Sequence, residues 1–163
     1  MFKIVLVTGH SMIPTLQNGE RVLAWTPVVR KPFKRGEIVT LFHIDHIHLP
    51  ADKRSRPNLH AAIATTEQEP VELFVKRIVG LPGDTIRIPV NQLSPHTLTI
   101  ADPQANRCGS DFVWHIPDGH VFVQGDGPHS IDSVVWGSIP FTQLKQIVLC
   151  RFPSFKRIPC TTI

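Results

Sequence analysis

The sequence predicts one mostly β domain, of the β-barrel or coiled-sheet kind, with irregular insertions. Its 163 residues suffice for one hydrophobic core and are short for two. Short apolar runs recur along the chain, and 15 prolines and 10 glycines interrupt it, which favours strands and turns over long helices. The sequence contains no long amphipathic helical pattern. We therefore expect residues 1–163 to form a single domain.

Each apolar run bounded by turn-forming residues predicts a strand. These runs are 2–7, 21–25, 38–42, 73–79, 85–88, 97–100, 112–116, 120–124 and 144–152. Residues 43–70 contain four histidines, several charges and three prolines, so we expect an inserted surface loop there. Residues 125–137, rich in Gly, Ser and Asp, predict a further loop, and the tail 153–163 is expected to be loosely held.

Composition limits the classes of function. The net charge is +4, but the basic residues are scattered and form neither a helical stripe nor an aromatic platform, so no nucleic-acid partner is expected. A membrane-surface role fits the charge better. The three cysteines are widely spaced and predict neither a disulfide framework nor a metal site.

Lys76 is the first candidate for chemistry. In the run 73–79 it shares a strand face with Phe74 and Ile78, whereas Arg77 points to the other face. A lysine on an apolar face is either an edge residue whose amine reaches solvent or a functional group. As a general base it must be neutral, and lowering a pKa of about 10.4 to about 8 costs roughly 3 kcal/mol, which burial can supply.

Ser11 is the candidate nucleophile. It lies in a loop between Gly9, which permits close backbone approach, and Pro14, which fixes the chain. Such a loop is typical of an ordinary turn, and it also suits a serine that attacks a carbonyl beside backbone N–H donors. Ser–Lys pairs are a known variant of serine catalysis.

The sequence resembles the type I signal peptidase family in four motifs that occur in the family's order. They are SMIPTL at 11–16, RGEIV at 35–39, KRIVGLPGD at 76–84 and GD-x-x-x-S-x-DS at 125–133. The resemblance implies a single catalytic domain in which Ser11 attacks the peptide carbonyl and Lys76 accepts its proton. It implies that Ser130 hydrogen-bonds and orients the lysine, and that the Ser11 N–H contributes to an oxyanion hole. It implies no cofactor and no metal.

The resemblance also implies what this peptidase acts on and where. It implies an endopeptidase that removes signal or presequence segments, binding its substrate as an extended added strand with small side chains before the cut. Residues 119–126, 129–133 and 148–153 are most similar to the mitochondrial inner membrane protease, subunit 2 type. That branch implies a membrane-associated heterodimer with a homologous subunit, on the intermembrane-space side of the mitochondrial inner membrane.

The sequence departs from the bacterial pattern in three respects. Val134 stands where bacterial members carry an Arg that pairs with the Asp, so Asp132 must find other partners. Gly9 stands where many bacterial members place an oxyanion-hole Ser. The N-terminal membrane anchor expected upstream of the nucleophile is missing from this sequence, so we expect a trimmed or incomplete form or a chain docked on an anchored partner.

Several alternatives remain open from the sequence. His43, His46 and His48 could ligate a metal, although solvated loop histidines are the simpler interpretation. His129 could instead be the base, with Asp126 or Asp132, whereas His10 points away from its neighbour Ser11.

A repressor-like self-cleaving protease would need an upstream DNA-binding motif, and none fits before Ser11. A partner-dependent or non-catalytic subunit and a basic β binding module are the remaining alternatives.

Overall fold

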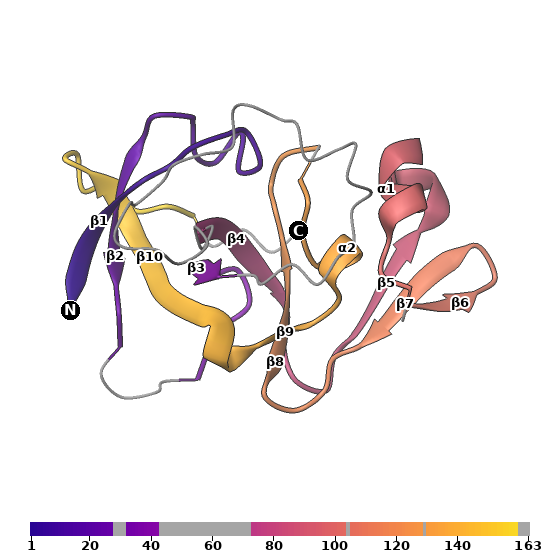
Figure 1. Ribbon diagram of the computed structural model, residues 1–163. Helices are drawn as coiled ribbons and strands as arrows, with labels where there is room; N and C mark the ends of the chain where they lie inside the picture. The colour runs from indigo at the N-terminus through magenta and orange to yellow at the C-terminus, as the bar shows by residue number, and fades with distance from the viewer. Residues whose placement is uncertain (28–31, 43–72, 104, 129, 160–163) are drawn as a thin grey trace, which may run out of the picture.

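The fold consists of two antiparallel sheets that lie next to one another (Figure 1). The computed structural model describes residues 1–27, 32–42, 73–103, 105–128 and 130–159. The larger sheet has the strand order β1-β2-β10-β3-β4-β8-β9, and the smaller sheet the order β5-β7-β6. The predominantly β prediction is therefore confirmed, and the strands form open sheets within the described residues. The predicted insert at 43–70 lies outside them.

Seven strands form the larger sheet. They are β1 (Phe2–Leu6), β2 (Arg21–Trp25), β3 (Ile38–Phe42), β4 (Leu73–Gly80), β8 (His120–Gln124), β9 (Ile139–Pro140) and β10 (Leu144–Phe152). The smaller sheet contains β5 (Thr85–Pro89), β6 (Asn106–Cys108) and β7 (Asp111–His115). Most of these strands coincide with the predicted runs, because apolar residues bounded by turns dominate both. The very short β6 and β9 carry too few residues to give a period-2 pattern, and they were not predicted.

Four short helices occur among the residues that the structure describes. They are α1 (Pro95–Ile100), α2 (Ser133–Trp136), η2 (Val90–Gln92) and η3 (Phe141–Gln143). The strand predicted at 97–100 is wrong, because these residues belong to α1. The hydroxyl of Ser94 caps that helix by accepting a 3.1 Å hydrogen bond from the Thr97 N–H, and Pro95 occupies the first helical position. The loop predicted at 125–137 is likewise wrong in part, because its end forms α2.

Three hydrophobic clusters form the core and hold the site in place. One lies under β1, β2 and the loop after β1, the second lies around β3, β4 and β8, and the third joins the smaller sheet to β8 and α2. The two sheets are therefore linked through Phe122 on β8, which packs with Trp114 on β7 at a ring distance of 5.1 Å.

The segment after β10 is held against the larger sheet as far as Pro159. The Arg151 N–H donates to the Lys156 carbonyl at 2.9 Å, and Ile158 is buried in the core. The expected loose tail is therefore wrong for residues 153–159, because a buried isoleucine and backbone hydrogen bonds fix them. Residues 160–163 lie outside the described part of the chain.

Candidate active site

Lys76 is buried on β4, between β3 and β8 in the larger sheet. Lys76 is only 2% exposed. A lysine in a protein interior is strongly disfavoured unless its amine has polar partners. The amine lies 5.9 Å from the centre of the Phe74 ring and 5.8 Å from that of Trp136. The structure thus places this amine among aromatic rings rather than at an edge of the sheet.

Ser130 is a hydrogen-bond partner of this amine. Lys76 Nζ donates to Ser130 Oγ at 3.0 Å, although the two residues are 54 positions apart in the sequence. Ser130 comes from the loop between β8 and α2, and β8 pairs directly with β4. The pairing of these two strands therefore brings the loop to the lysine.

Asp132 is buried and holds the loop that carries Ser130 through hydrogen bonds with two backbone N–H groups. One carboxylate oxygen accepts from the Gly125 N–H at 3.0 Å, and the other accepts from the Val134 N–H at 3.1 Å, capping α2. Burial raises the pKa of this carboxyl above its usual value, while the two N–H groups, the Lys76 charge and a hydrogen bond with Ser130 oppose the rise. Two backbone N–H groups and the Ser130 side chain are therefore the hydrogen-bond partners of Asp132, with valine rather than arginine at position 134.

Ser11 lies in the loop after β1, and two buried side chains hold this loop down. Met12 and Leu16 belong to the core, and the Leu16 N–H donates to the Met12 carbonyl at 2.8 Å. Gly9 has φ +84°, which favours glycine, and its N–H donates to Asn18 Oδ1 at 2.9 Å. The candidate nucleophile Ser11 is thus half-buried, on a loop that the buried side chains of Met12 and Leu16 hold against the core.

Two glycines join the Ser11 loop to the Ser130 loop. The Gly127 N–H donates to the Ser11 carbonyl at 2.9 Å. A Cβ atom added at Gly125 would collide with both the Ser130 side chain and the Ser11 carbonyl oxygen. The backbone of Ser11 therefore lies near Ser130, whose hydroxyl contacts Lys76, so three of the four sequence motifs meet here.

Arg77 is a supporting residue that the sequence reasoning missed. It is 1% exposed and forms a two-pronged ion pair with Asp126, with distances of 2.9 Å and 2.7 Å. It also donates to the Gly36 carbonyl at 2.8 Å and makes a long 3.4 Å contact with the Thr15 hydroxyl. Arg77 thereby links β4 to the ends of the Ser11 and Ser130 loops. An arginine inside an apolar strand was the available signal, since buried charges are normally paired.

The signal peptidase family, peptidase S26, matches residues 1–152 of this sequence. The chain belongs to this family. It is 32% identical to Signal peptidase I U of Bacillus subtilis over 149 residues, covering 81% of this chain and 65% of the relative. It is 32% identical to Probable signal peptidase I-2 of Synechocystis over 163 residues, covering 96% of this chain and 65% of the relative.

A mitochondrial protein is among the relatives of this signal peptidase family member. The chain is 29% identical to Mitochondrial inner membrane protease subunit 1 of Schizosaccharomyces pombe over 152 residues, covering 93% of this chain and 73% of the relative. The resemblance to the subunit 2 type stays a prediction. The chain spans 65% of the length of the Bacillus subtilis and Synechocystis relatives, slightly less than two thirds.

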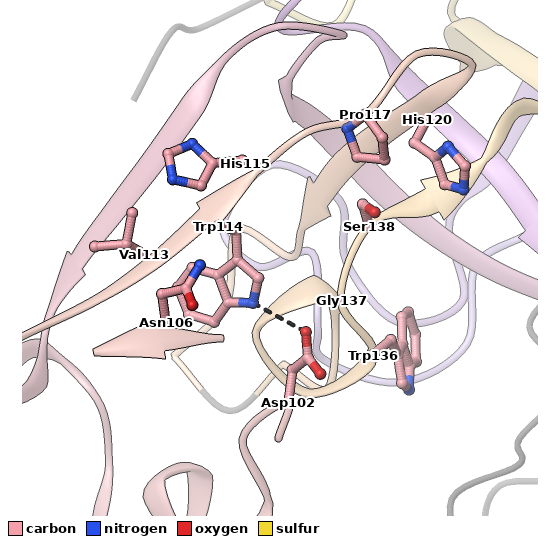
Figure 2. Close-up of a pocket in the computed structure, with 10 residues that line it drawn as sticks. All are labelled: Asp102, Asn106, Val113, Trp114, His115, Pro117, His120, Trp136, Gly137 and Ser138. Atoms are coloured by element: carbon pink, nitrogen blue, oxygen red, sulfur yellow. Dashed lines mark hydrogen bonds between the residues drawn. The ribbon is translucent and has the colours of Figure 1, made fainter. Parts of the chain in front are cut away.

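A polar pocket of about 420 Å³ lies beside this site, between the smaller sheet and α2 (Figure 2). Its lining residues are Asp102, Asn106, Val113, Trp114, His115, Pro117, His120, Trp136, Gly137 and Ser138. Asp102 accepts a 3.1 Å hydrogen bond from the Trp114 indole N–H, drawn in Figure 2. Trp136 lines the pocket and also lies near the Lys76 amine, so this one side chain is common to the pocket and the lysine's surroundings.

The described residues do not test the metal-site and His129 alternatives, which stay open. His10 is exposed, and His43, His46, His48 and His129 lie outside the described residues. Among the residues that the structure describes, no group of three potential metal ligands occurs. Likewise, none of the described helices is long and apolar enough to cross a membrane.

Proposed function

We propose that this protein is a serine endopeptidase that removes signal or presequence segments, with Ser11 as the nucleophile and Lys76 as the general base. The observation that carries the proposal is the buried Lys76 amine, hydrogen-bonded to Ser130 beside the Ser11 backbone. Membership of the signal peptidase family supports the reaction class. No metal or cofactor takes part in the proposed reaction.

The proposed reaction has two stages. In the first, the Ser11 oxygen attacks the peptide carbonyl while the neutral Lys76 amine takes the hydroxyl proton. The tetrahedral intermediate then collapses, Lys76 returns the proton to the departing amine, and an acyl ester remains on Ser11. In the second stage, water attacks that ester with Lys76 as base, which releases the new carboxyl end and restores Ser11.

Each neighbouring residue has a proposed part. Ser130 holds the amine in place through the 3.0 Å hydrogen bond, and Asp132 fixes the loop that carries Ser130. Phe74 and Trp136 lie about 6 Å from the amine and help to exclude water from it. The Ser11 N–H is the proposed oxyanion donor, and Gly9 leaves room beside it, because a Cβ at Gly9 would meet nothing within 4 Å.

The proposed substrate is an extended polypeptide at a membrane surface. Added-strand binding suits a fold made of open sheets, because an edge strand offers free backbone groups. β1 is such an edge, and Phe2, Ile4 and Leu6 on it are 63%, 53% and 55% exposed. These apolar side chains and the net positive charge support membrane association.

The proposed location is the intermembrane-space side of the mitochondrial inner membrane, in a heterodimer with a homologous subunit. The mitochondrial relative, itself named as a subunit, supports this location, whereas the bacterial relatives fit other membranes equally well. The alternative is a non-catalytic or partner-dependent subunit. Activity that appears only after adding a partner with a mutated serine would indicate dependence on the partner with catalysis by this chain.

Cleavage of a synthetic presequence peptide tests the proposed function. Ser11→Ala and Lys76→Ala should each abolish cleavage without unfolding the protein, whereas Ser110→Ala, at an exposed serine, should not. Cleavage should rise from about pH 5 to about pH 9, because Lys76 must lose its proton to act. Retained activity in either dyad variant would refute the mechanism.

A further inference from the structure

Residues 153–159 lie beyond the part of the chain that the family match covers, which ends at residue 152. After β10 the chain turns and runs back towards β4 (Figure 1). A backbone hydrogen bond from Arg151 to Lys156 and an isolated bridge between Cys150 and Arg157 hold the returning segment. This C-terminal segment is therefore structured by pairing with β10.

The C-terminal segment reaches the nucleophile side of the site through Ile158. This side chain is 9% exposed and belongs to the same hydrophobic cluster as Met12 and Leu16. Met12 directly follows Ser11 in the sequence. Ile158 thus forms part of the hydrophobic cluster against which the Ser11 loop packs.

The same segment reaches the Lys76 side of the site through Pro159. Arg77 Nη1 donates to the Pro159 carbonyl at 3.0 Å, and Arg77 directly follows Lys76 on β4. Just before this segment, at the end of β10, Arg151 donates from its side chain to the Thr15 carbonyl at 2.6 Å. The returning chain therefore touches both strand β4 and the Ser11 loop.

We propose that residues 153–159 are a positioning element that keeps the Ser11 loop in register with Lys76. The inference rests on the proposed function, since register matters only if the two residues react. No atom of the segment joins the reaction. Its effect is geometric, because a shift of about 1 Å between reacting groups can cost about a hundredfold in rate.

Ile158→Ala tests this role, with Lys156→Ala as the matched control. Lys156 lies in the same segment and is exposed, and its hydrogen bond uses only its backbone carbonyl. We expect Ile158→Ala to lower kcat by about tenfold or more with KM within about twofold, and Ile158→Val to recover most of the loss. Hydrogen exchange of residues 10–16 at a temperature well below unfolding should quicken in Ile158→Ala and not in the control.

The two readouts separate this proposal from the proposed function. Unchanged exchange at residues 10–16 in Ile158→Ala would overturn the positioning role, whether or not the protein cleaves peptides. Faster exchange with an unchanged kcat would overturn it as well, as would equal effects of Lys156→Ala. If the wild-type protein cleaves no peptide, the proposed function fails, and faster exchange in Ile158→Ala alone would still support the hold on the loop.

Discussion

The Lys76 amine and the Ser130 hydroxyl are joined by a 3.0 Å hydrogen bond in the interior of the larger sheet. The strand pairing of β4 with β8 creates this contact, and Gly125 lets the Ser11 backbone approach Ser130 from the other side. The contact therefore depends on three segments that are remote in sequence. The first three predictions each disturb one part of this arrangement.

Ser130→Ala removes a hydrogen-bond partner that holds the Lys76 amine in its orientation. We expect kcat to fall by about ten- to a hundredfold with KM nearly unchanged, because the loss concerns orientation rather than substrate contact. Steady-state cleavage of a presequence peptide measures both constants. A wild-type kcat in this variant would show that Ser130 does not orient the base.

Gly125→Ala forces a methyl group into the contact between Ser11 and Ser130. We expect a loss of activity and a decrease in the free energy of unfolding by about 1 to 3 kcal/mol, since the neighbours must move. Gly109→Ala is the control, because a Cβ there meets nothing within 4 Å and only the positive φ is strained, at roughly 1 kcal/mol. Full activity of Gly125→Ala would contradict the close approach of the two loops.

Asp126→Asn leaves the Arg77 guanidinium buried without its counter-charge. We expect the free energy of unfolding to fall by about 3 to 5 kcal/mol, because an uncompensated buried charge is costly. The matched control is Arg35→Ala, which breaks an ion pair with Asp84 in which Arg35 is 44% exposed, and should cost at most about 1 kcal/mol. Denaturant unfolding measures both variants, and equal losses would contradict the structural role of Arg77.

The raised pKa of Asp132 predicts a pH dependence of stability. A carboxyl with a higher pKa in the folded protein binds more protons there than in the unfolded chain. Its contribution to stability is therefore present below the unfolded pKa, about 3.8, and is lost as the pH rises through the folded pKa. Relative to Asp132→Asn, the wild type should gain stability as the pH falls through this window.

Thermal unfolding of the wild type and Asp132→Asn across that pH range measures the difference. Asp118→Asn, which removes an exposed carboxyl in the turn before β8, is the matched control. A wild-type advantage that shrinks as the pH falls would contradict the predicted sign.

Much of the fold could be predicted from local sequence, because strands such as 21–25, 38–42, 120–124 and 144–152 carry their own apolar pattern and flanking turns. The strand expected at 97–100 is wrong because the Ser94–Pro95 helix start outweighs the β preference of Thr97 and Thr99. α2 was missed because its four residues are too few for a helical period.

The site shows the same division between local and long-range information. A lysine among apolar strand residues was visible in the sequence, and the contact implied between Lys76 and Ser130 is present. The Arg77–Asp126 pair spans 49 positions, and the Pro159 contact with Arg77 spans 82, so neither leaves a local pattern. Such contacts follow from strand order, which local sequence does not determine.

Cleavage of a presequence peptide by Lys76→Met tests the proposed dyad most directly. Methionine fills the space between Phe74 and Trp136 without an amine, so the fold should persist while the base is lost. Lys145→Met is the matched control, since Lys145 is an exposed strand lysine 5.1 Å from the centre of an aromatic ring, that of Phe42. We predict at least a thousandfold slower cleavage by Lys76→Met and a wild-type rate for Lys145→Met, roughly the scale of general-base catalysis. A folded Lys76→Met protein that cleaves at the wild-type rate would contradict the account.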